Sequence, residues 1–528
     1  MTLRIDEEDN LFGSHVTMKD FLSDDDPLVI FSKEIYPMFN DKDFEDIYSK
    51  IGREAKSPSF LTMVTLLQYR ENMSDEEATE ACVRRIDWKI ALHLPFDAKQ
   101  QFDSSTLCRF RRRLKENEKS SMAFDKILEG IKTKGFIKKN TSQRIDATHI
   151  ISHVNKISTT DLLFRAVKCV VEEIRKLRIS YFKEFIPEDI KERYEGKFSS
   201  FGMSKEKRSD KMAEIIEDGL YLKKLLSENK NIDISEFTQL AIMETIFEEN
   251  VVITKKEVNA KIFIDVEEIQ SPKQTIFDPR DTSLKMGIKG KTCWVGSKCH
   301  IVETAEKGSS SFITGMIYQE ANGSDQKIHD KYIEVNNKSE LQPEKIFADQ
   351  NYISGKSIFK YQKNNQELLG AIGSDNSKKP DEFKLNKFEI DMKKMAAVCP
   401  MNKVSEKYSK MKDGSYQIYF AYSDCSKCAH AIECLGKDKK RKLHVNQYYE
   451  QIRERRLLQK TETFWKSMSV RAQVEGTISE AVRKLGLRFA KYYGKDGHQF
   501  QFYMTGAALN VKRLIKAMTK GMDMSPAM

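Results

Sequence analysis

At 528 residues the chain is too long for one hydrophobic core, so about two to four domains are expected. Its residues are 40% hydrophobic and 32% charged, which is typical of folded globular proteins and excludes a disordered chain. The acidic start, MTLRIDEEDN, lacks the apolar run of a secretory signal, and no stretch of about 18 apolar residues follows, so we expect a cytoplasmic protein without a membrane span.

The net charge of +10 is unevenly distributed along the chain. Residues 1–56 carry 14 acidic and 7 basic side chains, whereas residues 109–139 carry 11 basic and 4 acidic ones. Residues 471–520 carry 10 basic and 3 acidic side chains. Segregated positive charge favours a polyanionic partner, most simply nucleic acid. Two solvated helix faces are the alternative interpretation.

Residues 28–140 alternate apolar and polar side chains at helical spacing. Ser74 is the expected N-cap of the helix DEEATEACV, and Ser104 or Ser105 is the expected N-cap of the basic helix in FDSSTLCRFRRRLKEN. Two helices followed by a capped basic helix predict an all-α, helix-turn-helix-like DNA-binding domain at residues 1–140, whose last helix would enter the major groove. Four arginines of this helix are the candidate DNA contacts: Arg109, Arg111, Arg112 and Arg113.

The pattern changes at residue 143, where QRIDATHIISHV predicts a strand with Asp146 and Thr148 on one face. Residues 156–250 return to long, charged helical patterns. Strands resume in KTCWVGSKCHIVET, SSSFITGMIYQE, EKIFAD and QELLGAIG, with helices near residues 325–337 and 353–363 between them. This order predicts an α/β fold whose first strand is separated from the others by helices.

Four of the nine cysteines cluster in the Lys-rich, irregular segment 376–445. Their spacing, Cys399 and then Cys425-x2-Cys428-x5-Cys434, suits one structural zinc ion held by four thiolates. An iron–sulfur cluster and free thiols are the alternatives, and His430 could replace one ligand. Residues 446–488 then predict one or two long helices, TGAALNVKRLIKAM predicts a final amphipathic helix, and residues 521–528 a flexible tail.

Three acidic residues stand at positions where a sheet could gather them. Asp146 lies on the first strand, Asp349 directly follows the strand in EKIFAD, and Glu475 lies on the helix RAQVEGTISEAV. If the first strand is central and pairs with the strand of residues 344–348, the two aspartates lie on strands about 4.8 Å apart. A helix packed across that sheet edge could add Glu475. Oxygen ligands alone select Mg²⁺ or Mn²⁺, and two such ions about 4 Å apart activate a water or a 3′-hydroxyl and stabilise the leaving oxygen.

These motifs resemble, in order, those of bacterial insertion-sequence DDE transposases. RIDATHI resembles the strand of the first aspartate, IFADQNYIS the segment of the second, and RAQVEGTISEAVRKLGLRFAKYYG with AALNVKRL the glutamate helix; FDSSTLCRFRRRL is similar to the family's helical DNA-binding domain. The resemblance implies an RNase H-like mixed sheet with flanking helices at residues 141–520, interrupted by the helical insert (156–285) and the Cys-rich insert (376–445).

Related families carry a Tyr-x2-Arg-x3-Glu-x6-Lys signature, which this sequence matches only in part. Arg471 and Glu475 match it, whereas Met468 and Val482 stand at the Tyr and Lys positions. The resemblance implies that Arg471 contacts DNA phosphate or positions Glu475. It also implies that Lys298 contacts DNA, for which a solvated strand lysine is the alternative.

The activity that the resemblance implies is metal-dependent cleavage at the ends of an insertion sequence, followed by 3′-OH strand transfer into target DNA. Asp146, Asp349 and Glu475 would hold two Mg²⁺ or Mn²⁺ ions. The partners would be double-stranded DNA, as terminal inverted repeats and as target, and a second copy of the chain, giving a nucleoid-associated homodimer on DNA. The alternatives are a structure-specific nuclease without strand transfer and a catalytically inactive, domesticated DNA-binding protein. We expect Asp278 and Asp281 to cap a loop and His149 to pack rather than to catalyse.

Overall fold

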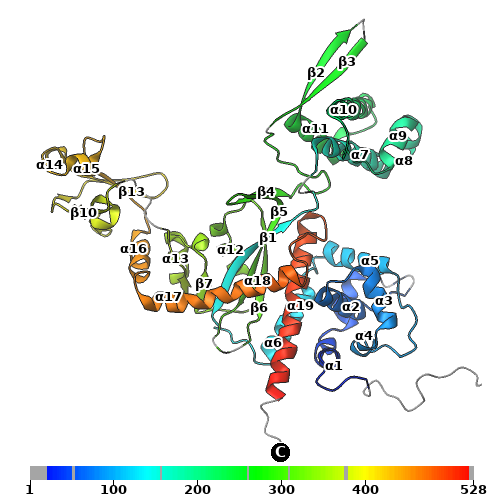
Figure 1. The fold of residues 1–528 in the computed structure, drawn as a ribbon, viewed down its shortest axis with the longest axis horizontal. Coiled ribbons are helices and arrows are strands. Elements are labelled where there is room, and N and C mark those ends of the chain that lie inside the picture. The colour runs from blue at the N-terminus through cyan, green and yellow to red at the C-terminus, as the bar shows by residue number, and fades with distance from the viewer. Residues whose placement is uncertain are drawn as a thin grey trace, which may run out of the picture.

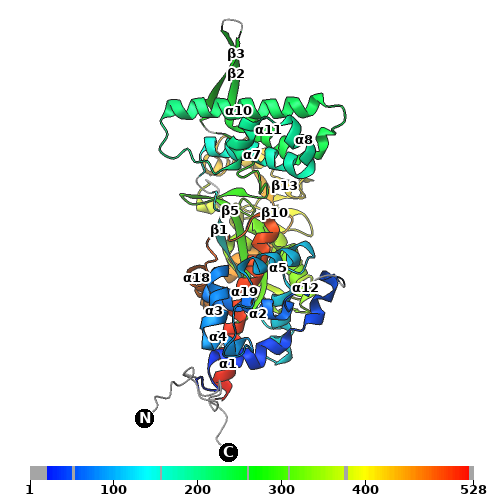
Figure 2. The same ribbon diagram turned by 90° about the vertical axis from the view of Figure 1, so that its right-hand side faces the viewer.

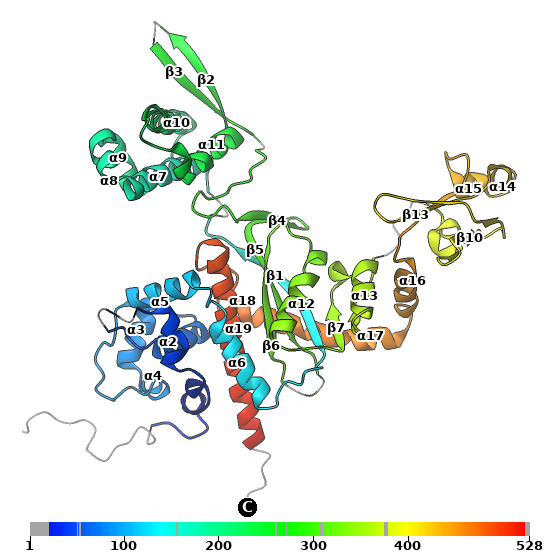
Figure 3. The ribbon, with the colours of Figure 1, turned by 180° about the vertical axis from the view of Figure 1, so that it is seen from behind.

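The computed structural model describes residues 21–522, apart from residues 50, 52–53, 155–156, 259–260, 271, 307, 309 and 374–378. A mixed β-sheet forms the centre, and three lobes surround it: N-terminal helices, a helical insert and a Cys-containing lobe (Figures 1 and 3). The N-terminal helices share one hydrophobic core with the last helix and one face of the sheet, whereas the insert and the Cys-containing lobe each have a core of their own.

The central sheet is built around β1. This strand pairs antiparallel with β5 and parallel with β7, β7 pairs parallel with β8, and β5 also pairs antiparallel with β4 and β6. The pairings give the order β6-β5-β1-β7-β8, so the C-terminal ends of β6, β1 and β7 lie at the same edge of the sheet. The predicted mixed α/β architecture is therefore found. The bounds are β1 (Gln143–Ile151), β4 (Lys285–Lys289), β5 (Thr292–Thr304), β6 (Ile313–Glu320), β7 (Lys345–Ala348) and β8 (Glu367–Leu369).

Helices cover both faces of this sheet. α12 (His329–Lys338) and α13 (Gly355–Gln362) lie on the face of Ile145, where a cluster of apolar and tyrosine side chains is buried. α18 (Gln473–Arg483) and α19 (Gly494–Met522) lie on the opposite face (Figure 1). Asp146 follows Ile145 on β1 and therefore points to this second face. Because successive side chains of a strand point to opposite faces, Arg144, Asp146 and Thr148 all project toward α18.

The N-terminal lobe consists of α1 (Pro27–Ile30), α2 (Pro58–Glu71), α3 (Asp75–Arg84), α4 (Ile86–Ala91), α5 (Ser104–Glu116) and α6 (Met122–Thr133). Ser74 is the N-cap of α3, as the sequence predicted, and it forms a capping box with Glu77 that was not predicted. The predicted cap of α5 was wrong: the Asp103 carboxylate accepts the backbone N–H of Ser105 at 2.9 Å, so Asp103 is the N-cap, one residue before Ser104. A carboxylate there also complements the positive end of the helix dipole.

The insert leaves the sheet after β1 and ends in a hairpin. Its elements are α7 (Thr159–Leu177), α8 (Ile179–Phe185), α9 (Glu188–Glu195), α10 (Lys205–Glu228), α11 (Thr238–Asn250), β2 (Val251–Val258) and β3 (Lys261–Glu268). β2 and β3 pair antiparallel and project away from the sheet (Figure 2). The sequence predicted a largely helical insert and missed this hairpin, although VVITKKEV and KIFIDVEE are rich in β-branched residues.

The Cys-containing lobe combines two small antiparallel sheets, β11-β10-β9 and β12-β13-β14, with two short helices. Its elements are β9 (Glu389–Asp391), β10 (Ala396–Val398), β11 (Val404–Ser405), β12 (Tyr408–Lys410), β13 (Tyr416–Tyr419), α14 (Tyr422–Ser426), α15 (Ala431–Leu435) and β14 (Lys442–Val445). α16 (Tyr449–Leu458) and α17 (Glu462–Met468) then return the chain to the sheet (Figure 3).

The last helix is longer than predicted, and it ends inside the predicted tail of residues 521–528. α19 extends to Met522, and residues 523–528 lie outside the described residues. Within the described part of the chain, no helix is both long enough and apolar enough to span a membrane.

Candidate active site

Two neighbouring parallel strands bring Asp146 and Asp349 to the same edge of the sheet. The register of β1 and β7 pairs Ile145 with Ala348, and each aspartate is the next residue of its chain segment. Glu475 comes from the first turn of α18, which packs on β1. All three carboxylates line one pocket of about 470 Å³. The structure thus brings together three residues that lie far apart in the sequence.

The pocket perturbs Asp146 most clearly. Burial raises the pKa of this carboxyl group, and the negative charge of Asp349 adds to the rise. The backbone N–H of Ala147, which donates to Asp146 Oδ1 at 2.7 Å, and the guanidinium of Arg471 act in the opposite direction. A cation bound between the two aspartates would relieve their repulsion.

Arg471 lies between two of the three carboxylates. Its Nη1 is 3.3 Å from Asp146 Oδ2, and its Nη2 is 3.5 Å from Glu475 Oε1. The Glu475 side chain is 65% exposed. Because residues four apart share a helix face, Arg471 can hold Glu475 near the sheet and partly neutralise both acids.

Lys298 reaches the same pocket from β5. Its ammonium group donates to the carbonyl oxygen of Gly323 at 2.7 Å and to Asp325 Oδ1 at 3.0 Å. Lys289 and Arg488 also line the pocket. Four basic side chains therefore surround the acidic residues, so the pocket also offers positive charge to an anionic ligand.

Asp325, which the sequence pattern did not predict, is a fourth carboxylate in this pocket. Asp325 follows β6, which is parallel to β1 and ends at the same edge of the sheet. The segment EANGSD has the composition of a turn and gives no local sign of a functional acid. Only the strand order reveals its position.

The turn that follows Asp349 is held by buried polar side chains. The hydroxyl group of Tyr352 lies 2.6 Å from His300 Nδ1, and His300 Nε2 lies 3.0 Å from Gln319 Oε1. Burial lowers the pKa of His300 to about 4, so the ring is neutral at pH 7 and can accept from Tyr352 while it donates to Gln319. His329 Nε2 adds a hydrogen bond of 2.8 Å to the Tyr352 carbonyl oxygen.

His149 packs against a neighbouring ring, and Asp278 and Asp281 cap loop turns. His149 packs on Trp294 with their ring centroids 4.9 Å apart, and burial together with Arg488 and Lys289 lowers its pKa to about 4. Asp278 accepts the backbone N–H of Arg280, and Asp281 accepts that of Ser283. Both aspartates are thus held in loop turns.

The oxygen donors of the pocket suit a hard divalent cation, although their side chains do not form a closed ligand set. Among the residues that the structure describes, no three His, Cys, Asp or Glu side chains are gathered closely enough to hold a metal ion. Asp146 and Asp349 have adjacent backbone positions, and the exposed Glu475 side chain can rotate toward them. The carboxylates therefore suit Mg²⁺ or Mn²⁺ in the chemistry of their oxygen donors.

The four predicted DNA-contacting arginines of α5 have different environments. Arg109 and Arg112 are exposed on one side of the helix, and Arg113 lies 4.1 Å from the centroid of the Tyr48 ring. Arg111 faces inward, where its side chain is 5% exposed and forms a two-point ion pair with Asp75. The prediction for Arg111 needs correction, because this buried guanidinium cannot reach a DNA backbone without breaking that pair.

The four clustered cysteines line a second cavity, of about 440 Å³. The backbone N–H of Lys403 donates to Cys399 Sγ at 3.3 Å, and that of Arg441 donates to Cys425 Sγ at 3.5 Å. Burial raises the pKa of the Cys434 thiol; Arg441 opposes this rise, and neighbouring cysteines add to it. The sulfur atoms surround one space but do not form a closed ligand set.

Two known protein families match this chain. The family described as Transposase domain (DUF772) matches residues 16–113, and the family described as Transposase DDE domain matches residues 398–515. Searches of curated proteins and of solved structures gave no match. The first match contains the α5 arginines, and the second contains the cysteines, Arg471 and Glu475.

These two matches and the acidic pocket of the α/β domain support a transposase. Over residues 16–113 and 398–515 the chain is similar to transposases, which supports an insertion-sequence DDE transposase.

Proposed function

We propose that the chain cuts phosphodiester bonds at the ends of its insertion sequence and joins the freed 3′-OH to target DNA. The observation that carries this proposal is the convergence of Asp146, Asp349 and Glu475 on one pocket. The strand order β6-β5-β1-β7-β8, with β5 antiparallel to its neighbours, supports an RNase H-like catalytic domain at residues 141–520. The insert and the Cys-containing lobe would interrupt this domain, and residues 1–140 would form the DNA-binding domain.

The three carboxylates would hold two Mg²⁺ or Mn²⁺ ions, since hard cations prefer oxygen ligands. Bound there, the ions would activate a water or a 3′-hydroxyl and stabilise the leaving oxygen. Arg471 would hold Glu475 at the pocket and screen Asp146 until the site is filled. Lys298 and Arg488 would attract the DNA phosphates next to the cleaved bond.

DNA binding would use the exposed side of α5 for the terminal inverted repeats. Arg109 and Arg112 are the exposed cations of this helix and would contact phosphate or base edges. Two ends must be cut and joined together, so we propose that a homodimer assembles on DNA. The basic side chains of the pocket would contact the cleaved strand and then the target DNA.

The test combines labelled end DNA, Mg²⁺ and a supercoiled target plasmid. We expect Asp349→Asn and Glu475→Gln to bind end DNA normally but to lose more than about a hundredfold in cleavage rate, because loss of groups that merely support metal ligands already costs about 10–100-fold. Asp330→Asn is the matched control, since that carboxylate is 88% exposed and pairs with Lys360. Cleavage without joined products would indicate the nuclease alternative. Binding without cleavage by the unmodified chain would indicate an inactive DNA-binding protein.

We also propose that the four clustered cysteines hold a structural zinc ion. Two of their sulfur atoms accept backbone N–H groups, an arrangement that stabilises thiolates, and all four line one cavity. Zinc would require the sulfur atoms to move closer together than they are in this structure. Metal analysis of the purified protein should find one zinc per chain, which Cys425→Ser with Cys428→Ser should remove. Iron would indicate a cluster, and absence of both metals would indicate free thiols.

A further inference from the structure

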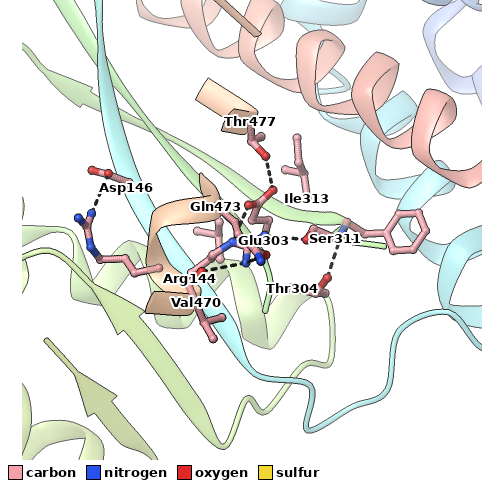
Figure 4. Close-up of polar contacts among 12 residues, drawn as sticks. Arg144, Asp146, Glu303, Thr304, Ser311, Ile313, Val470, Gln473 and Thr477 are labelled. Carbon is pink, nitrogen blue, oxygen red and sulfur yellow. Dashed lines mark hydrogen bonds and ion pairs between the residues drawn. The ribbon is translucent and has the colours of Figure 1, made fainter. Parts of the chain in front are cut away.

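A buried ionic cluster lies directly beside the acidic pocket, on the sheet face that α18 covers (Figure 4). Arg144 of β1 and Glu303 of β5 are cross-strand partners, and their side chains are 2% and 0% exposed. Arg144 Nε donates to Glu303 Oε1 at 2.7 Å. Glu303 Oε2 accepts from Arg513 of α19 at 2.8 Å and from the hydroxyl group of Thr477 at 2.7 Å. We call Arg144, Glu303, Thr477 and Arg513 the buried brace.

The brace holds the chain on both sides of Glu475. Before Glu475, Arg144 Nη1 donates to the carbonyl oxygen of Val470 at 3.0 Å and to Gln473 Oε1 at 2.7 Å. After Glu475, the Thr477 hydroxyl group is bound to Glu303 and accepts from Arg513 Nη2 at 2.6 Å. The helix turn that carries Glu475 is therefore fixed at its start and at its end by directed hydrogen bonds.

One member of the brace, Arg144, lies on the strand that carries Asp146. Arg144 lies two residues before Asp146 on the same strand face, a separation of about 7 Å. The same side chain thus reaches from the strand of one pocket acid to the helix of another. Glu475 itself is 65% exposed, and its contact with Arg471 is 3.5 Å long, so its own interactions fix its position weakly.

We propose that the buried brace positions Glu475 relative to Asp146 and Asp349, an inference that rests on the proposed function of these acids. A buried ion cluster adds little net stability compared with apolar packing, because desolvation of the charges offsets their attraction. Its directed bonds nevertheless permit only one rotation and one height of α18 on the sheet. Thr477 is the member best suited to a test, because its loss leaves Glu303 paired with both arginines.

The experiment compares three variants of the full-length protein. Thr477→Val removes the hydroxyl group at nearly constant volume, and Thr477→Ser restores it. Thr505→Val is the matched control, because Thr505 is a fully buried helical threonine whose hydroxyl group donates to the Gln501 carbonyl oxygen within α19. The measurements are amide hydrogen exchange of α18, Mn²⁺ binding by electron paramagnetic resonance, and the rate of end cleavage with saturating DNA.

We expect Thr477→Val to raise the exchange of α18 amides and to lower Mn²⁺ affinity and the cleavage rate by about tenfold each, because it removes the hydrogen bonds of the Thr477 hydroxyl group with Glu303 and Arg513. The affinity for end DNA should stay within about twofold, and Thr477→Ser should return each value toward that of the unmodified protein. Thr505→Val should change none of them.

Equal behaviour of Thr477→Val and Thr505→Val would overturn the positioning role, whether both are unchanged or both lose activity through general destabilisation. If the unmodified protein neither binds Mn²⁺ through Asp349 nor cleaves DNA, the proposed function fails instead. The exchange of α18 in the absence of metal still decides whether the brace fixes this helix.

Discussion

Arg111 and Arg112 are adjacent in α5, yet we expect alanine at position 111 to lower the folding stability and alanine at position 112 to weaken DNA binding. Both Nη atoms of Arg111 donate to Asp75, at 2.9 and 2.5 Å, and its guanidinium lies 5.4 Å from the centroid of the Tyr492 ring. Removing one partner of a buried ion pair costs about 3–5 kcal/mol. The Asp75 side chain is 20% exposed and can be partly rehydrated. The ion pair joins α5 to α3, so Arg111→Ala should lower the free energy of unfolding. Because Asp75 can be partly rehydrated, we expect a loss of about 3 kcal/mol, the lower end of that range.

Arg112→Ala should leave the folding stability unchanged and weaken DNA binding. Its side chain is exposed, and surface substitutions usually change the free energy of unfolding by less than about 0.5 kcal/mol. Loss of one phosphate contact should make the negative slope of log K against log salt concentration shallower by about 0.9. Thermal unfolding and a salt series of binding to end DNA measure both effects. A normal melting temperature of Arg111→Ala, together with a loss of DNA binding like that of Arg112→Ala, would show that Arg111 contacts DNA and does not stabilise the fold.

Two further predictions concern buried groups. His300 has its pKa lowered by burial to about 4, against about 6.5 when exposed, so between these values the unfolded chain binds a proton that the folded chain does not. The free energy of unfolding should therefore fall by up to about 3 kcal/mol from this group as the pH falls from about 6.5 to 4. Urea unfolding should show a smaller fall for His300→Gln. Identical pH profiles of the two proteins would contradict a lowered pKa of His300. A fragment of residues 21–140 should fail to fold alone, because every residue from Pro58 to Tyr69 is buried and α19 covers part of that surface. Circular dichroism should show cooperative unfolding only when residues 489–522 are joined to the fragment, and a cooperative transition of the fragment alone would refute this.

Local patterns in the sequence were sufficient for most of the sheet and for several helix ends. The β-branched run around Asp146 predicted β1, and Ser74 predicted the start of α3. The inward position of Arg111 was also readable, since it lies four residues after Leu107 and three before Leu114, both buried. The charge of Arg111 and the neighbouring arginines led to the prediction that it contacts DNA, whereas its helical spacing indicates a position in the core.

Features that depend on pairing between distant segments could not be predicted in the same way. Glu303 lies in a strand and has no neighbour in sequence that explains a buried carboxylate; Arg144 and Arg513 supply its partners from β1 and α19. Asp325 reaches the pocket only because β6 is parallel to β1. In both cases the controlling quantity is strand order, which no local pattern specifies.

α19 explains why the first and last segments of the chain form one body. It packs on α2 and α6 of the N-terminal lobe and on β6 of the sheet, and its side chains join all three in one core. The same helix carries Arg513 into the buried brace. The exposed arginines of α5 and the acidic pocket are consequently connected through packed helices rather than through a flexible linker. A densely packed core of this kind deforms little, so the packing of α19 sets the distance between the proposed DNA-binding surface and the proposed cleavage site.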